Sequence, residues 1–244
     1  MSETQRDRLF DAIRVWMADL EAYPGWKEWR RQRFAHTLHF DNLWPEQSEV
    51  PGHDFKFSSE IENQHAVVIQ YLGLAQTIDA LKECEFYFRR FPFHGMPVSH
   101  YNHVTNICEM YFGRFYEFKE RLKQYFDAVD AATPAHNLIV GAFIKQFGQV
   151  FDQELRKRNQ IHHERRFEEI GIDRLLLTGS LASNPEDRGW KREHMIAYRM
   201  VTSQWAQRVR RRGAQMDQFL EATARATLES CSFLSERARG PVSS

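Results

Sequence analysis

The sequence of 244 residues contains few cysteines, and their positions exclude several kinds of site. Cys84, Cys108 and Cys231 lie far apart, and none belongs to a C-x-x-C pair. This spacing indicates neither a disulfide framework nor a thiolate zinc site. We therefore expect a protein of a reducing compartment, the cytoplasm.

Long apolar runs and an excess of charge are also absent. No run approaches the roughly 20 apolar residues that cross a bilayer, and the first residues lack the hydrophobic region of a signal peptide. Lys plus Arg and Asp plus Glu each number 33, which gives a formal net charge of zero. We expect no membrane association, and any contact with RNA requires a local basic patch.

Several catalytic and cofactor motifs are missing as well. The chain has no G-x-x-x-x-G-K-[ST], G-x-G-x-x-G or G-x-S-x-G segment, so a phosphate-binding loop, a dinucleotide site and a hydrolase nucleophile are not indicated. His36, His39 and Asp41, and separately His100 and His103, have spacings compatible with metal binding, but no second ligand cluster accompanies either group. We therefore predict no metal and no cofactor.

Helical periodicity is the dominant pattern in what remains. Apolar residues recur at alternating spacings of four and three over residues 104–129, as in the seam of a helical bundle; they are Val104, Cys108, Tyr111, Phe115, Phe118, Leu122, Tyr125 and Val129. Ser59 and Glu62 fit a capping box before another helix, and Thr133-Pro134 fits the start of a third that runs to about residue 166. Residues 170–189 lose this periodicity and favour a loop or hairpin.

These patterns predict an all-α fold. We expect an antiparallel bundle of four main helices, with an N-terminal helical extension and a short irregular or hairpin insertion before the last helix. The predicted organisation is one domain overall: residues 1–57 as the extension and covering loop, 58–235 as the bundle and 236–244 as a disordered tail.

The third predicted helix ends in an unusual polar segment, RNQIHHERR, residues 158–166. At helical spacing the apolar stripe Phe147, Phe151, Leu155 continues onto Arg158 and Asn159 and then onto two histidines. A simple explanation is that cations favour the negative end of the helix dipole, by about 0.3–1 kcal/mol each. That explanation leaves the charge on the inward edge of the helix unexplained, because burying an unpaired arginine is costly.

Residues Arg158-Asn159-Gln160-Ile161-His162-His163 resemble the R-x4-H signature, often R-N-x-x-x-H, of the HEPN superfamily. The resemblance covers roughly residues 58–235. It implies a compact helical bundle with the signature at the end of a core helix. It also implies a metal-independent endoribonuclease, often dimeric, of the toxin or antiviral-defence type.

Carried over to this sequence, the resemblance implies Arg158 and His163 as catalytic residues, with Asn159 as the accompanying polar residue. The doubled histidine leaves open whether His162 or His163 faces the cleft. An imidazole can exchange a proton with the ribose 2′-OH, and a guanidinium can clamp phosphate oxygens, so this chemistry needs no metal. Neighbouring cations are candidates for positioning RNA phosphates: Arg156, Lys157, Arg165 and Arg166.

The expected partners are an RNA substrate and a second copy of the chain in a homodimer. An antitoxin or a nucleotidyltransferase-type protein is a further partner that the resemblance implies. The alternative function is a non-catalytic helical module that binds a nucleotide or a protein. A second basic segment, residues 208–212, is a further candidate to position phosphates, and its simpler interpretation is a solvated helix face. His194 is a candidate to approach Arg158 if the last helix packs there.

Overall fold

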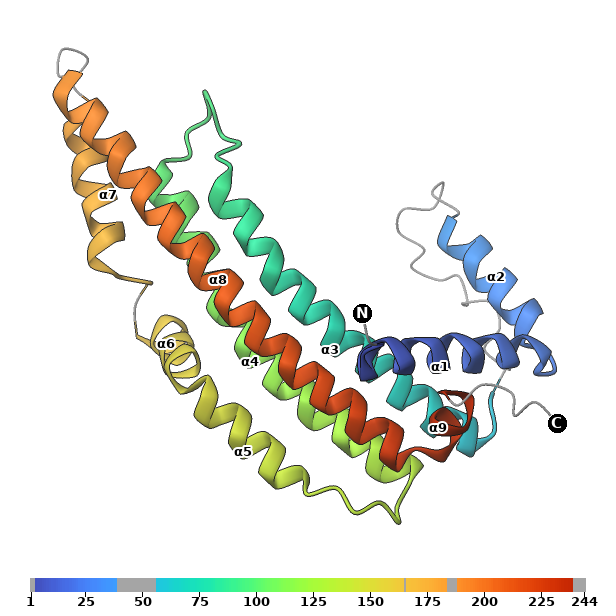
Figure 1. Ribbon diagram of the computed structural model, residues 1–244. Coiled ribbons are helices and arrows are strands. Elements are labelled where there is room, and N and C mark those ends of the chain that lie inside the picture. Colours follow the sequence, from blue (N-terminus) through green and yellow to red (C-terminus); the bar gives the residue numbers. More distant parts are fainter. Residues whose placement is uncertain (1–2, 39–55, 165, 184–187, 239–244) are drawn as a thin grey trace. The chain divides into compact units, whose positions relative to one another are not determined.

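The computed structural model describes residues 3–38, 56–164, 166–183 and 188–238. Helices joined by short loops make up this part of the chain, and it contains no strand. The predicted all-α class is therefore confirmed. Figure 1 shows the helices, which are α1 (Gln5–Asp19), the 3-10 helix η1 (Leu20–Ala22), α2 (Trp26–Leu38), α3 (Ser59–Arg89), α4 (His100–Ala132), α5 (Val140–Val150), α6 (Asp152–His163), α7 (Ile170–Leu181), α8 (Arg188–Ser230) and α9 (Ser232–Ala238). None of the described helices is long and apolar enough to span a bilayer.

The chain divides into two compact units. Unit 1 consists of residues 1–69, 127–138 and 221–244, and unit 2 consists of residues 70–126 and 139–220. The long helices α3, α4 and α8 each contribute residues to both units.

Unit 1 is organised around the first helix. Thr4 and Asp7 form a capping box at the start of α1, and the carboxylate of Glu221 accepts hydrogen bonds from the backbone N–H groups of Gln5 and Arg6 at 2.6 and 3.1 Å. These contacts satisfy donors that a helix start leaves open. Trp16 of α1 is buried, and its indole N–H donates to Gln64 at 2.9 Å.

The core of unit 2 is aromatic. All eight residues of the predicted seam on α4, of which Val129 belongs to unit 1, are at most 1% exposed, which confirms the periodicity of that helix. Rings from other helices pack on it: Phe147 lies 5.1 Å from Phe118, and Trp205 lies 5.5 Å from Tyr111, between ring centroids. Such pairs add about 0.5–1.5 kcal/mol each beyond the burial of their apolar area.

The predicted loop or hairpin in residues 170–189 is wrong for its first part. Residues Ile170–Leu181 form α7, which lies alongside the first part of α8 (Figure 1). The reason for the missed helix is that α7 exposes apolar side chains on its outer side, including Leu177 at 65%, while Leu175 is buried. With apolar residues on both sides, the helical alternation disappears from the sequence. Residues 184–187, the predicted start of the last helix, lie outside the described residues.

The predicted helix start at Thr133-Pro134 is also wrong. The N–H of Thr133 donates to the carbonyl of Val129 at 2.8 Å and so completes the last turn of α4. A turn follows, in which the N–H of His136 donates to the Thr133 carbonyl, and α5 begins only at Val140. The predicted third helix is moreover two helices, because the backbone leaves helical geometry at Phe151, with φ −112° and ψ 24°.

Smaller differences concern the ends of helices. The cap of α3 is provided by Ser58, whose hydroxyl accepts from the N–H of Ile61 at 3.4 Å, one position before the predicted Ser59. Residues 236–238, expected in a disordered tail, form the last turn of α9. Most of the predicted covering loop, residues 39–55, lies outside the described residues.

Candidate functional site

The helix that carries the motif, α6, is anchored by a buried carboxylate. The break at Phe151 rotates α6 relative to α5, so that Glu154 and not Leu155 takes the inward position one turn later. Glu154 is 0% exposed. A buried charge without a partner costs several kcal/mol, so this position requires a cation.

Two arginines of α8 provide that cation. The guanidinium of Arg212 donates two hydrogen bonds to the carboxylate of Glu154, with Nε–Oε1 at 2.9 Å and Nη2–Oε2 at 3.0 Å. Arg208, one turn earlier, donates to Oε1 at 3.4 Å, and its guanidinium also lies over the ring of Trp205 at 4.8 Å. A bidentate pair is the strongest geometry available to these groups, and it fixes α6 against α8.

These contacts overturn the prediction of a solvated face for Arg208 and Arg212, whereas Arg210 and Arg211 are exposed. Arg208 and Arg212 turn inward, and Arg210 binds Glu85 of α3 at 2.8 Å. The basic run therefore joins helices of unit 2. Its sequence signal was the i, i+4 spacing of two arginines, which places both on the same side of a helix as the buried Val209 and Met216.

The motif residues follow Glu154 on the outer half of α6. Arg158 is partly buried, and its guanidinium lies 3.8 Å from the ring centroid of Tyr116 on α4. The same guanidinium donates to the side-chain oxygen of Asn159 at 3.3 Å. Tyr116 is 38% exposed, so the stacked arginine lies at the edge of the aromatic core with its donors near solvent. The sequence did not identify Tyr116 as a partner, because it lies on another helix.

Both histidines of the motif are exposed. The rings of His162 and His163 meet edge to face with centroids 4.7 Å apart. Residues five apart on a helix differ by about 140° around its axis, and α6 is helical from Asp152 to His163. Arg158 and His163 of one chain therefore do not face a common point.

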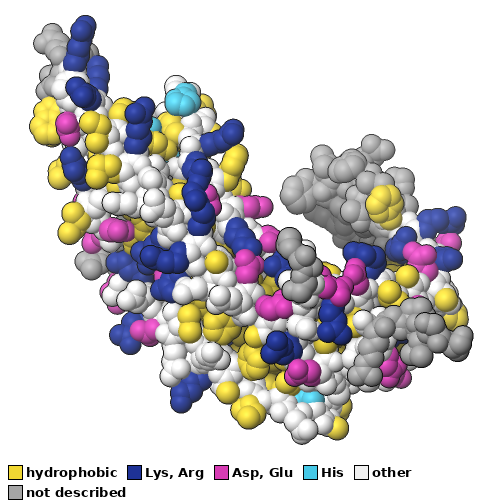
Figure 2. Space-filling model, viewed as in Figure 1, with side chains coloured by type: hydrophobic (Ala, Val, Ile, Leu, Met, Phe, Trp, Pro, Cys, Tyr) yellow, Lys and Arg dark blue, Asp and Glu magenta, His cyan; other side chains and the backbone are white. Residues whose placement is uncertain are grey.

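The cations predicted to bind phosphate have neighbours within the chain. Arg156 pairs with Asp152 at 2.9 Å, Lys157 lies over the Phe167 ring at 5.2 Å, and Arg166 donates to Asn106 at 2.8 Å. Arg165 lies outside the described residues. Exposed pairs of this kind are worth about 0–1 kcal/mol, so a phosphate can replace the protein partner at little cost. Figure 2 shows Lys and Arg side chains gathered over this part of unit 2.

The remaining candidate histidines lie elsewhere. His103 is buried, and its Nε2 lies 3.2 and 3.0 Å from the carbonyls of Tyr87 and Arg90, which places a donor at the end of α3. His100 instead faces His194, with Nδ1–Nε2 at 3.0 Å. No group of three potential metal ligands occurs in the part of the chain that the structure describes. His39 and Asp41, which belong with His36 to the other group whose spacing is compatible with metal binding, lie outside the described residues.

His194 is therefore distant from the motif residues of α6, which are Arg158, Asn159, His162 and His163 and which we call the α6 strip. α6 contacts α8 through Arg208 and Arg212, and Arg208 follows His194 by 14 positions, which is about 21 Å along a helix. The predicted approach of His194 to Arg158 is wrong, since the imidazole is held by His100 and Thr178.

Comparisons with known proteins add no identification. No family model matches this chain, and no curated protein or solved structure matches it. The function proposed below therefore rests on the resemblance of the motif and on the geometry of unit 2.

Proposed function

We propose that the chain is a HEPN-like, metal-independent endoribonuclease that acts as a homodimer. The observation that carries this proposal is the state of α6: its inner half is fixed by the Glu154–Arg212 pair, while its outer half presents Arg158, Asn159 and two exposed histidines. An antiparallel bundle of four main helices, as in the HEPN superfamily, is the architecture that we propose for the domain.

The active centre that we propose combines two chains. Because Arg158 and His163 diverge on one helix, a site that uses both needs Arg158 of one copy and His163 of the other. A twofold axis near the end of α6 brings these groups together twice, since an isologous interface presents the same patch on both subunits.

The reaction follows from the two side chains. A neutral imidazole takes the proton of the ribose 2′-OH while its oxygen attacks the phosphorus, and the bond to the 5′-oxygen breaks. The products are a 2′,3′-cyclic phosphate and a 5′-OH end; the leaving 5′-oxygen takes its proton from water, and the imidazolium returns its proton to the solvent. Arg158 offsets the charge that develops on the phosphate oxygens. Arg156, Lys157, Arg165 and Arg166 hold the neighbouring phosphates.

The alternative is a binding module without catalysis. Stacking of Arg158 on Tyr116 and its bond to Asn159 favour this alternative, because they already engage the guanidinium. A nucleotide phosphate or an acidic segment of a protein such as an antitoxin or a nucleotidyltransferase would then bind to the strip.

Cleavage of single-stranded RNA in EDTA distinguishes the two functions. The nuclease produces fragments with cyclic phosphate ends and leaves DNA of the same sequence intact, because DNA lacks the 2′-OH. Retained RNA binding with no cleavage would instead identify the binding module. Absence of both would refute the proposal for the α6 strip.

A further inference from the structure

A cavity of about 460 Å³ lies at the end of unit 2 where α7 and α8 meet the α3–α4 loop. Its volume falls in the range of small-molecule sites. The walls are mainly aromatic and aliphatic, with Phe91, Phe93 and Val98 on the loop side and Leu175 and Leu176 on α7. We call it the histidine pocket, because His94, His100 and His194 also line it.

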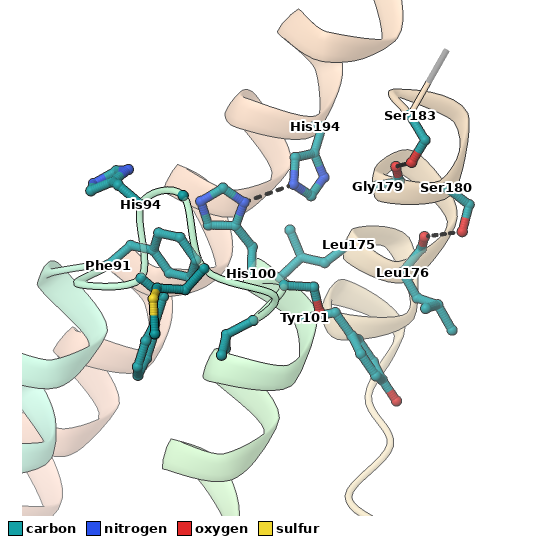
Figure 3. Close-up of a pocket in the computed structure, with 15 residues that line it drawn as sticks. Phe91, His94, His100, Tyr101, Leu175, Leu176, Gly179, Ser180, Ser183 and His194 are labelled. Carbon is teal, nitrogen blue, oxygen red and sulfur yellow. Dashed lines mark hydrogen bonds between the residues drawn. The ribbon is translucent and has the colours of Figure 1, made fainter. Parts of the chain in front are cut away.

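Two of these histidines, His100 and His194, belong to a series of three hydrogen-bonded side chains from three helices, whose third member, Thr178, lies behind the wall. Thr178 of α7 lies 3.0 Å from Nδ1 of His194 on α8, and Nε2 of His194 lies 3.0 Å from Nδ1 of His100 on α4. Figure 3 shows the two imidazoles facing each other across the second bond, with α7 on one side and the loop after Phe91 on the other.

The direction of these bonds follows from the threonine. The Thr178 hydroxyl donates its one proton to the Arg174 carbonyl at 2.7 Å, so it accepts from Nδ1–H of His194. Nε2 of His194 then carries no proton and accepts from Nδ1–H of His100. This series of hydrogen bonds therefore leaves Nε2 of His100 without a proton, so that it can accept a further hydrogen bond.

The site is built closely around these rings. An added Cβ at Gly179 of α7 would lie 3.3 Å from Cε1 of His194, so this glycine permits the imidazole to approach the helix. His100 lies between two further rings, with centroids 4.1 Å from Phe91 and 4.2 Å from Tyr198. Both imidazoles are thus held in position by packing as well as by hydrogen bonds.

The lining favours an uncharged ligand. The described residues of the wall include no Asp, Glu, Lys or Arg. Burial and, to a smaller extent, the neighbouring His194, His103 and His94 together lower the pKa of His100 to about 4. The pKa of His194 is also lowered by burial. His100 and His194 are therefore neutral at physiological pH, and neither attracts an anion by charge.

We propose that the histidine pocket binds a small, uncharged aromatic molecule through a ligand N–H group that donates to Nε2 of His100. The aromatic walls supply most of the contact, and the Thr178–His194–His100 chain orients the acceptor. This site is separate from the α6 strip, and the proposal holds whether or not the protein cleaves RNA.

Indole and 1-methylindole test the proposal as a matched pair. They have the same ring, but only indole has an N–H donor. With the full-length protein labelled at histidine with ¹⁵N, we expect NMR to identify His100 as the Nδ1–H tautomer. Indole is expected to shift its Nε2 signal, and 1-methylindole to bind about tenfold more weakly, the value of one hydrogen bond.

The His100→Phe variant sharpens the test, since it keeps a ring between Phe91 and Tyr198 but removes the acceptor. We expect indole and 1-methylindole to bind this variant equally. Equal binding of both ligands to the wild-type protein would overturn the proposal. So would a proton on Nε2 of His100, or the absence of any shift up to the solubility limit of indole.

Discussion

Unit 2 contains two groups of polar side chains that differ in how they are held. At the end of α6, two histidines adjacent in the sequence are exposed, and the nearby arginine rests on Tyr116. In the histidine pocket, His100 and His194 are 94 positions apart but share a hydrogen bond. The first group forms a recognisable sequence motif, but its histidines are exposed. The second group forms defined contacts, but no local sequence pattern indicates it.

A sequence motif therefore does not show whether its side chains are held in place in the folded chain. The α6 strip gains its order indirectly, from the Glu154–Arg212 pair one turn before it. The histidine pocket gains its order from contacts made by the histidines themselves. The proposed nuclease would use the exposed groups of the α6 strip together with a second chain, while the contacts of the histidine pocket lie within one chain.

The largest expected effect concerns catalysis by the α6 strip. Arg158→Ala or His163→Ala is expected to slow RNA cleavage by about 10²–10⁴-fold, because each removes charge stabilisation or proton transfer in the transition state. The free energy of unfolding should change by less than about 1 kcal/mol. Cleavage assays in EDTA and urea unfolding measure the two quantities, with the exposed Arg14→Ala of α1 as the control. A loss of several kcal/mol in Arg158→Ala would instead assign this arginine to the fold.

The anchor of the strip gives the next largest effect, on stability. Glu154→Ala leaves Arg212 and Arg208 without their buried partner and is expected to lower the free energy of unfolding by about 3–5 kcal/mol. Asp152→Ala on the same helix breaks the exposed pair with Arg156 and should cost at most about 1 kcal/mol. Urea unfolding of both variants checks the contrast. Equal losses would contradict the account of how α6 is held.

A glycine substitution tests how closely the pocket is built. Alanine in a helix interior is normally more stable than glycine by about 0.5–1 kcal/mol. Gly113→Ala should show this gain, because an added Cβ there meets no atom within 4 Å. Gly179→Ala should show no gain and should shift the ¹⁵N signals of His194, because its Cβ would meet the imidazole. A full gain without a spectral change would mean that His194 is not packed against α7.

Acidification tests the environment of His100. His100 has a pKa of about 4 in the folded chain, lowered by burial, against about 6.5 when unfolded. Between these values the unfolded chain binds the additional proton, so stability is retained above about pH 6.5 and falls as pH drops toward 4. Urea unfolding at pH 7 and pH 5 should show a smaller loss in His100→Phe than in the wild type, while the exposed His163→Phe should match the wild type. Identical losses in the wild type and His100→Phe would refute a depressed pKa.

The sequence predicted those parts of the fold in which burial has a helical period. The seam of α4 is such a case, because every third or fourth residue from Val104 to Val129 is buried. α7 was missed because Leu175, Leu176 and Leu177 are consecutive while only Leu175 is buried. The break at Phe151 was also missed, and so was the burial of Glu154. The spacing was a usable signal, because a residue three positions after a core phenylalanine lies on the same side of a helix.

For the candidate sites, the sequence predicted only those features that depend on residues close together along the chain. The position of the motif at the end of a helix followed from local spacing. The partners did not, because Tyr116 precedes Arg158 by 42 positions and His100 precedes His194 by 94. Such pairs are determined by how helices pack, which one sequence does not encode in any local pattern.

Mixing of two inactive variants tests whether Arg158 and His163 act together across two chains. Arg158→Ala and His163→Ala are each expected to be inactive in EDTA, whereas a mixture re-equilibrated to form heterodimers should regain cleavage, because one of its two composite sites is intact. A mixture that forms heterodimers but remains as inactive as its components would contradict the claim.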